Sequence, residues 1–426
     1  MILIALAVCL IIGFFVKPKH FPYLMIVYFV FYDMFDGFYK DDKIYSVFRY
    51  IVPLTLMFTY CFMYGVLKKL DLIFVTFMGY LFMLWAINAG DPIITARTML
   101  SMILTLMMIP IGKHLSERDF FTLELEKYNR LLLIALPAYI IWANIVGIAG
   151  YYTDAFSTGY LITSRMYIVP MVVFLGFHYA MTNKDRHWMM KTVDIGAILV
   201  NICIMLLNTR RTALGMLLGG IFIYTYFNRQ LVVKMVMLVF ALIMALILAY
   251  PLYEARLTAQ LEKRERIQNL DTYGEEPRAL ETLYIIDYHE RNRDLAQLLF
   301  GIKLWDSYDF GVKYFGRDRP IHSDINMMLF SIGLFGELLF FSMVQFYFFR
   351  RNSRMHPYNK MLFYPFLAML FMILLPGRFI GTLTFAPFLI LLLTTLKYEA
   401  QPLPEPEEEE EAEAEVQAPL ALASPA

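Results

Sequence analysis

The chain carries one apolar run after another, and the runs are long enough to form helices that cross a lipid bilayer. A hydrocarbon core about 30 Å thick requires roughly 17–25 apolar residues in a helix, and such runs cover most of the 426 residues. Hydrophobic residues make up 59% of the sequence, whereas soluble domains lie nearer to about 45–50%. A transmembrane barrel would alternate apolar and polar residues. The sequence therefore predicts an all-α integral membrane protein.

We expect about 12–13 transmembrane helices, because two of the runs are short for a membrane span. The first run lacks an A-x-A-like cleavage site and is expected to remain as a membrane helix. The predicted helices lie near residues 2–16, 22–33, 46–67, 70–89, 95–112, 130–149, 160–181, 192–208, 211–227, 232–250, 324–349, 360–376 and 379–396.

Lysine and arginine in the short loops predict the orientation, because cytoplasmic loops carry an excess of these residues. One set of loops holds 18 of them, and the opposite set, with nearby helix ends, holds 8. The first set is therefore expected to be cytoplasmic. The smaller set comprises Lys40, Lys43, Arg49, Arg97, Arg165, Arg210, Arg211 and Arg378.

This orientation divides the chain into four parts. Residues 1–250 form the first ten helices, 251–323 a large, mostly helical outer loop, 324–397 the last helices, and 398–426 a cytoplasmic tail. The tail contains the acidic run Glu407–Glu411 and too few apolar residues to bury a core, so it is expected to be disordered. The formal net charge is zero, which gives no reason to expect a nucleic-acid partner.

The outer loop holds several candidate anion-binding arginines. Its first part, Tyr253–Leu283, is dense in charges of both signs, most of which are expected to be solvated; they include Arg256, Lys263, Arg264, Arg266, Arg278, Glu254, Glu262, Glu265, Glu275, Glu276 and Glu281. The stretch Pro277–Phe300 is predicted to be one helix that ends at Gly301. Arg278 then lies in its first turn, where the helix dipole favours an anion.

Two adjacent arginines, Arg210 and Arg211, stand between two apolar runs at the predicted outer surface. They could extend toward lipid headgroups. They could also clamp a phosphate, which a guanidinium binds with a planar fork of donors. Charged residues at a membrane boundary are costly and are therefore candidates for function.

Of the seven histidines, only His289 and His322 are predicted to face outward. His322 follows Arg317 and Arg319 and stands directly before an apolar helix. A neutral imidazole at such a site can accept a proton near neutral pH, which makes His322 the candidate general base.

Four acids, Asp33, Asp36, Asp41 and Asp42, occupy the first outer loop. Paired carboxylates could hold a divalent metal or act as a base. Their spacing matches no tight coordination pattern, and the three cysteines are far apart in apolar runs, so we expect no metal site.

Taken in order, several motifs resemble those of the O-antigen ligase and O-antigen polymerase superfamily. They are Asn-Thr-Arg-Arg-Thr (208–212), the large outer loop, Leu-Leu-Phe-Gly (298–301) and the run from His322 to Gly336, which ends Gly-Leu-Phe-Gly. The resemblance covers residues 200–350; before that, only helix count and hydropathy match. The double arginine departs from the family's Ser-x-Ser-Arg or Ser-Arg-Ser, so it is open which arginine corresponds.

The resemblance implies a metal-independent, inverting glycosyltransferase without a cofactor, in the bacterial inner membrane with its site facing the periplasm. Its donor would be an oligosaccharide on polyprenyl diphosphate. Its acceptor would be a glycan, or lipid A-core for a ligase, and a chain-length regulator protein would be a further partner. His322 and Arg278 would be catalytic. The expected substrate-binding residues are Arg210, Arg211, Arg256, Arg264 and Arg319.

Three alternatives differ from this expectation. Polymerase and ligase differ only in the acceptor, and we favour the polymerase. A metal-dependent transferase would use the four aspartates with a lipid monophosphate donor. A transporter or flippase of lipid-linked glycan would place its charges at mid-membrane depth, whereas the charges of this chain gather at the outer boundary.

Overall fold

The structure is a computed structural model. It describes isolated positions between residues 233 and 258 and, in full, residues 1–39, 44–117, 121–148, 157–182, 187–208, 211–229, 277–316, 318–375 and 377–399. Within these ranges the chain is helical and contains no β-strand, and one isolated bridge joins Ala89 to Leu304. The prediction of an all-α protein is confirmed for this part of the chain.

Ten helices precede the outer loop in the described ranges. They are α1 (Ile2–Val16), α2 (Phe21–Phe35), α3 (Ile44–Met63), α4 (Leu72–Ile87), α5 (Pro92–Leu106), α6 (Met108–Leu115), α7 (Phe121–Val146), α8 (Ile168–Thr182), α9 (Trp188–Leu207) and α10 (Arg211–Phe227). The described part of the loop and the chain after it contain α12 (Pro277–Asn292), α13 (Leu295–Phe300), α14 (Tyr308–Phe315), α15 (Asp324–Val344), α16 (Pro357–Leu374) and α17 (Ala386–Tyr398). The predicted helix 232–250 falls mostly outside the described residues.

The described residues contain six helical stretches that are long and apolar enough to cross a membrane: Pro18–Tyr39, Pro92–Leu115, Glu124–Val146, Trp188–Leu207, Asp324–Arg354 and Pro357–Leu374. Shorter apolar helices lie among them. A helix satisfies its own backbone hydrogen bonds, which is what a lipid environment demands. These helices fit a multi-pass membrane protein.

Several predicted helix bounds are wrong. Helix α7 begins at Phe121 and not near 130, α8 begins at Ile168 and not near 160, and α17 begins at Ala386 and not near 379. The expected helix 95–112 ends at Leu106, and α6 follows from Met108.

The expected single helix Pro277–Phe300 is broken into α12 and α13. The break occurs at Arg293, where φ is 49°, and at Asp294, which caps α13. The carboxylate of Asp294 accepts hydrogen bonds from the N–H groups of Ala296 and Gln297. An N-cap of this kind starts a new helix and so ends the previous one.

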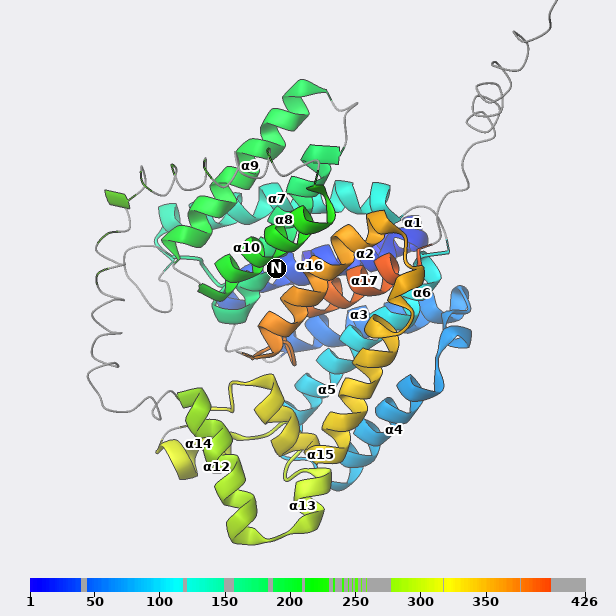
Figure 1. The fold of residues 1–426 in the computed structure, drawn as a ribbon, viewed down its shortest axis with the longest axis vertical. Helices are drawn as coiled ribbons and strands as arrows, with labels where there is room; N and C mark the ends of the chain where they lie inside the picture. The colour runs from blue at the N-terminus through cyan, green and yellow to red at the C-terminus, as the bar shows by residue number, and fades with distance from the viewer. Residues whose placement is uncertain are drawn as a thin grey trace, which may run out of the picture.

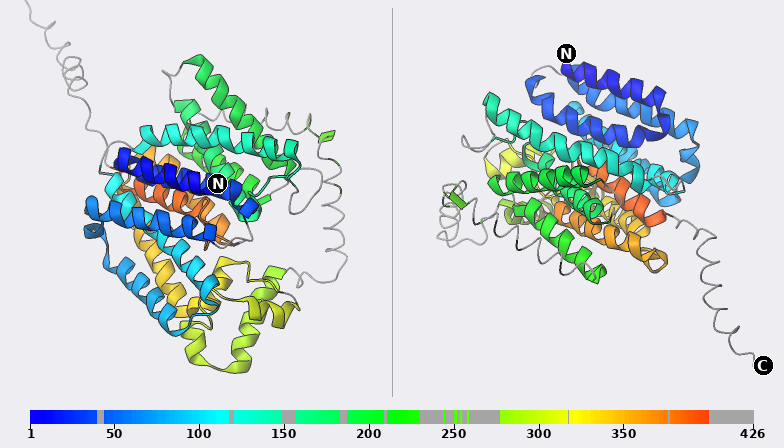
Figure 2. Two further views of the ribbon diagram at one scale, coloured as in Figure 1. Left: turned by 180° about the vertical axis from the view of Figure 1, so that it is seen from behind. Right: turned by 90° about the horizontal axis from the view of Figure 1, so that it is seen from above.

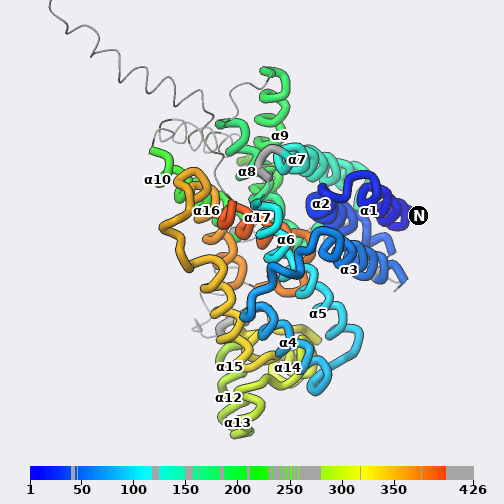
Figure 3. The backbone as a smooth tube through the Cα atoms, turned by 90° about the vertical axis from the view of Figure 1, so that its right-hand side faces the viewer, coloured from blue at the N-terminus to red at the C-terminus, as the bar shows by residue number. Residues whose placement is uncertain are grey.

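Two helices, α8 and α17, lie in the middle of the bundle and are buried over almost their whole length. Figure 1 shows α17 between α16 and the N-terminal helices. Figure 2 places α1 and α2 on one side of the bundle and α10 and α16 on the opposite side, and Figure 3 gives the same arrangement from a third direction. The charged sites described below lie at the ends of these helices.

Charged side chains form contacts at both ends of the helices. At one end, Lys113 pairs with Asp71 at 2.8 Å, and Tyr347 donates to the same carboxylate at 2.7 Å. These contacts join the start of α4 to the ends of α6 and α15. At the other end, Arg165 pairs with Asp36 at 2.7 Å.

The described part of the loop 251–323 is fixed to the helical bundle. Asn88 donates from Nδ2 to the carbonyl of Gly301 (3.2 Å), and the N–H of Leu304 donates to the carbonyl of Asn88 (2.9 Å). Nearby, the N–H of Asp91 donates to the carboxylate of Asp306 at 2.8 Å. Figures 1 and 3 show the result, with α12 and α13 beside the outer end of α15. This segment is therefore tied to the turn between α4 and α5.

Helix α15 is kinked at Gly333, where φ is 66° and ψ is 179°. Two backbone carbonyls shortly before the kink, those of Phe330 and Ile332, accept hydrogen bonds from outside the helix. The N–H of Ile302 donates to Phe330 at 2.8 Å, and the hydroxyl of Tyr80 donates to Ile332 at 2.6 Å. A side chain at Gly333 would meet the backbone of residues 299–301 within about 2.5 Å. The glycine therefore lets the outer loop pack directly on α15.

Candidate functional site

The imidazole of His322 is held by contacts at both of its nitrogens. Its Nδ1 lies 2.8 Å from the carbonyl oxygen of Pro320, and its Nε2 lies 3.3 Å from a guanidinium nitrogen of Arg378. A carbonyl can only accept a hydrogen bond. Nδ1 also lies 3.2 Å from a guanidinium nitrogen of Arg319. The carbonyl of Pro320 and the carboxylate of Glu281 favour a proton on Nδ1, which leaves the single lone pair of Nε2 to accept from Arg378. This tautomer is the one that a base acting through Nε2 needs.

Glu281 of α12 holds the backbone and the ring of His322. Its carboxylate is fully buried and accepts from the N–H groups of His322 (3.0 Å) and Ser323 (3.3 Å). It also lies 3.5 Å from Nδ1 of His322. A carboxylate behind a histidine fixes the tautomer and the ring orientation, as in serine hydrolases.

Burial acts to raise the pKa of Glu281, but this effect is outweighed. Hydrogen bonds from the side chain and backbone of His322 and the backbone of Ser323, together with the charge of Arg319, hold the pKa of Glu281 below its usual value. Glu281 is therefore an anion at neutral pH. It supplies the negative charge behind His322.

Glu281 is an exception to the expectation that most charges of Tyr253–Leu283 are solvated, because its side chain is fully buried. Its position in the helix gave a usable signal. Glu281 shares a helix face with Tyr284, Ile285 and Tyr288, at the i, i+3, i+4 and i+7 spacing of a buried stripe. Ile285 packs in a small core beneath the outer loop.

Arg319, expected to bind substrate, is engaged inside the protein. It forms a short ion pair with Glu281, and its guanidinium lies 4.3 Å from the centre of the Phe315 ring. Only 11% of its side chain is exposed. In the structure Arg319 neutralises and positions Glu281.

Arg378 lies in the loop between α16 and α17. From the sequence it was counted among the basic loop residues but was not a candidate site residue. Its φ is 82°, between Gly377 at 98° and Gly381 at 85°. A left-handed conformation of this kind costs a residue with a side chain about 1–3 kcal/mol and persists only where the surroundings impose it. At Gly377 a side chain would overlap the carbonyl oxygen of His322, at 1.4 Å. The loop therefore passes directly against the backbone of His322.

Asp324, the first residue of α15, fixes this loop. Its buried carboxylate accepts from the N–H groups of Phe379 (2.6 Å) and Ile380 (3.1 Å). The five residues Glu281, Arg319, His322, Asp324 and Arg378 are called the His322 cluster below.

The structure does not bring all the expected residues together. The side chains of Arg211, the first residue of α10, and Arg278, the second residue of α12, are not described. His289 lies near the far end of α12, two helical turns from Glu281. The remaining predicted residues fall outside the described part of the chain: Arg210, Arg256, Arg264 and Arg317.

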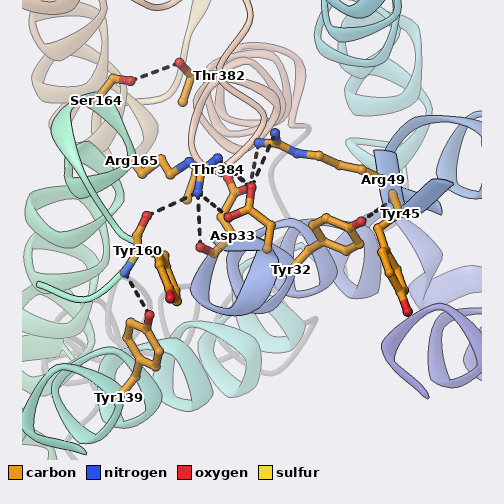
Figure 4. Close-up of polar contacts among 11 residues, drawn as sticks. Tyr32, Asp33, Tyr45, Arg49, Tyr139, Tyr160, Ser164, Arg165, Thr382 and Thr384 are labelled. Atoms are coloured by element: carbon orange, nitrogen blue, oxygen red, sulfur yellow. Dashed lines mark hydrogen bonds and ion pairs between the residues drawn. The ribbon is translucent and has the colours of Figure 1, made fainter. Parts of the chain in front are cut away.

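Two of the four acids expected in the first outer loop are held by arginines. Asp33 lies inside α2 and pairs with Arg49 at 2.6 Å (Figure 4). Asp36, in the turn after α2, pairs with Arg165 through both of its oxygens, at 2.8 and 2.7 Å. Asp41 and Asp42 lie outside the described residues. Across the described ranges, no three His, Cys, Asp or Glu side chains converge in a way that could hold a metal ion.

The His322 cluster can carry out one kind of chemistry. It offers a proton acceptor at Nε2 of His322, with a guanidinium beside it that can attract an anionic group.

Comparison of the chain with protein-family models, curated proteins and solved structures gave no match in any of the three.

Proposed function

We propose that this chain is a membrane-embedded, inverting glycosyltransferase that needs no metal. It would move an oligosaccharide from a polyprenyl-diphosphate donor, of the undecaprenyl kind, to an acceptor glycan during assembly of surface polysaccharide. The enzyme would lie in the bacterial inner membrane with the His322 cluster facing the periplasm. One observation carries the proposal: Nε2 of His322 lies 3.3 Å from Arg378, while the opposite nitrogen is anchored.

In the proposed reaction, the acceptor hydroxyl gives its proton to Nε2 of His322. The acceptor oxygen then bonds to the anomeric carbon of the donor sugar from the side opposite the diphosphate. The bond from that carbon to the diphosphate oxygen breaks, and its electron pair leaves with the diphosphate. Negative charge grows on the leaving group, so nearby guanidinium groups stabilise the transition state more than the bound donor.

Arginines supply this positive charge in the proposal. Arg378 donates to the single lone pair of Nε2, so in the proposal it releases this nitrogen before His322 accepts a proton, and its N–H donors then bind the diphosphate. Arg278 in the first turn of α12 and the pair Arg210–Arg211 remain the expected diphosphate ligands. Arg319 is given a different role, since its ion pair with Glu281 leaves it little exposed.

The acceptor distinguishes two forms of the function. A polymerase would transfer the glycan to another lipid-linked repeat, and a ligase would transfer it to lipid A-core. We favour the polymerase and keep the ligase as the alternative. A gel of surface polysaccharide from a deletion strain separates them. Core with a single repeat indicates a missing polymerase, and bare core with long polymer on the carrier lipid indicates a missing ligase.

The test of the chemistry uses purified protein in lipid nanodiscs with a polyprenyl-diphosphate-linked oligosaccharide. We expect His322→Ala and Arg278→Ala to abolish transfer while membrane insertion stays normal. Matched controls lie on the same outer segment: His289→Ala, and Arg291→Ala, whose side chain is 75% exposed. Full activity of either test variant would refute the mechanism. Activity that is lost with EDTA and restored by Mg²⁺ or Mn²⁺ would favour the aspartate-based alternative.

A further inference from the structure

A second cluster of buried charges lies at the same end of the helices as the His322 cluster. It consists of Asp33, Asp36, Arg49, Arg165 and Thr384, and is called the Asp33 network below (Figure 4). Its members come from α2, from the turn that follows α2, from α3, from the turn before α8, and from the loop before α17. Among the described contacts, none joins this network directly to His322. The Asp33 network can therefore affect His322 only through a segment of the chain that contacts both.

The centre of the network is Asp33, whose side chain is fully buried. Arg49 lies 2.6 Å from one of its oxygens, and Arg165 lies 3.7 Å from the same oxygen. The hydroxyl of Thr384 donates a short hydrogen bond to the other oxygen. Arg165 also donates to the backbone carbonyls of Asp33 (3.2 Å) and Tyr160 (3.1 Å).

The network is balanced in charge, with two carboxylates and two guanidinium groups. Buried ion pairs of this kind add little net stability, because desolvation offsets most of their attraction. They can instead impose one geometry on the segments that they join. The segment of interest is the loop that carries Thr384, because the same loop carries Arg378.

Two carboxylates hold this loop, one near its beginning and one near its end. Asp324 binds the N–H groups of Phe379 and Ile380, next to Arg378. Asp33 binds Thr384 near the start of α17. Between them, the hydroxyls of Thr382 and Ser164 lie 3.2 Å apart, as Figure 4 shows. The left-handed backbone at Arg378 therefore lies in a loop that is fixed at its beginning and at its end.

We propose that Asp33 and Thr384 are positioning residues for the transfer reaction, holding Arg378 opposite Nε2 of His322 through the loop of residues 377–385. This inference rests on the proposed function for its effect on transfer. Its effect on the loop stands independently of any substrate.

The test variant is Thr384→Val, which removes the hydroxyl that binds Asp33 and nearly preserves the shape of the side chain. Thr384→Ser keeps the hydroxyl and should restore the wild-type behaviour. The matched control is Thr395→Val in α17. Thr395 is equally buried, and its hydroxyl donates within its own helix to Leu391 at 2.7 Å. All three proteins are prepared as the full chain in lipid nanodiscs.

Hydrogen exchange measures the loop without a substrate. We expect the amides of Phe379 and Ile380 to exchange roughly 10- to 100-fold faster in Thr384→Val, the range that corresponds to loss of one hydrogen bond to a charged acceptor. We expect no change in Thr395→Val and wild-type rates in Thr384→Ser. Unchanged exchange in Thr384→Val would overturn the proposal.

Turnover measures the consequence for catalysis. A misplaced Arg378 should lower kcat about tenfold or more while KM stays within about twofold, because the group acts mainly in the transition state. A rise in KM with unchanged kcat would contradict the positioning role. If the wild-type protein shows no transfer at all while exchange responds as expected, the proposed function fails and the coupling between Asp33 and the Arg378 loop stands.

Discussion

Glu281 is the residue whose replacement tests the His322 cluster most directly. The variant Glu281→Gln keeps the shape of the side chain and removes its charge. Two backbone hydrogen bonds to the carboxylate become neutral ones, at a cost of about 1 kcal/mol each. Arg319 loses its partner as well. Breaking a fully buried pair costs about 3–5 kcal/mol, and the partial exposure of Arg319 reduces that value.

The two backbone bonds account for about 2 kcal/mol, and the reduced cost of the Arg319 pair adds to this. The local cost is therefore at least about 3 kcal/mol, which corresponds to roughly 100-fold or more faster opening of the segment that Glu281 holds. The amides of His322 and Ser323 report this opening, since both donate to Glu281. Hydrogen exchange at these two amides is the first assay. The matched control is Glu290→Gln, an exposed residue on the same helix.

The second assay is turnover with a lipid-linked glycan. Without the carboxylate, the ring of His322 is free to adopt the wrong tautomer or orientation. Neutralising the carboxylate behind a catalytic histidine lowers turnover by up to about 10⁴-fold in serine proteases, and we expect a loss on the order of 10²–10⁴ here. A variant with wild-type turnover and unchanged exchange at His322 would refute the reasoning.

The pKa of Glu281 also sets the pH window of this contact. The folded-state value is depressed, so the stabilisation is fully present above the unfolded value of about 4.3. It is lost as the pH falls through the folded value, which lies below that. Between about pH 5 and 8, protection of the His322 and Ser323 amides relative to their intrinsic exchange rates should therefore not change through titration of Glu281.

Two further predictions concern the loop before α17. Gly377→Ala should abolish transfer and lower the melting temperature, because the new methyl group would overlap the carbonyl oxygen of His322 at a site with φ 98°. The control is Gly79→Ala, which should be neutral because no atom lies within 4 Å of the added methyl group. Arg378→Gly should abolish transfer without lowering the melting temperature, because it relieves about 1 kcal/mol of left-handed strain. A Gly377→Ala protein that is fully active, or an Arg378→Gly protein that unfolds more easily, would contradict the account of this loop.

The helices could be predicted from the sequence because their physical cause is local. A continuous apolar run fixes both the helix and its length in a bilayer. The wrong bounds arise where tertiary contacts decide the local structure. Asp294 starts a new helix within an apparently continuous pattern, and the loop before α17 extends to Phe385 because Asp324 binds its backbone.

The candidate site was predictable in part for the same reason. His322 could be identified from its place between polar loop and apolar helix. Glu281 and Arg378 could not be connected to it, since they lie 41 and 56 residues away along the chain. Asp33 was considered as a metal ligand, and only the structure reveals that its carboxylate is occupied by Arg49 and Thr384.

The contact between Asp33 and Thr384 spans 351 residues, and this separation has a consequence for how the protein is made. At about 5–20 residues per second, Thr384 leaves the ribosome roughly 20–70 s after Asp33. Asp33 can pair with Arg49 almost at once, and with Arg165 later, but the loop that carries Arg378 follows only after α16. The His322 cluster and the Asp33 network therefore cannot be complete before residues 377–385 have been synthesised, and until then the two arginines alone hold Asp33.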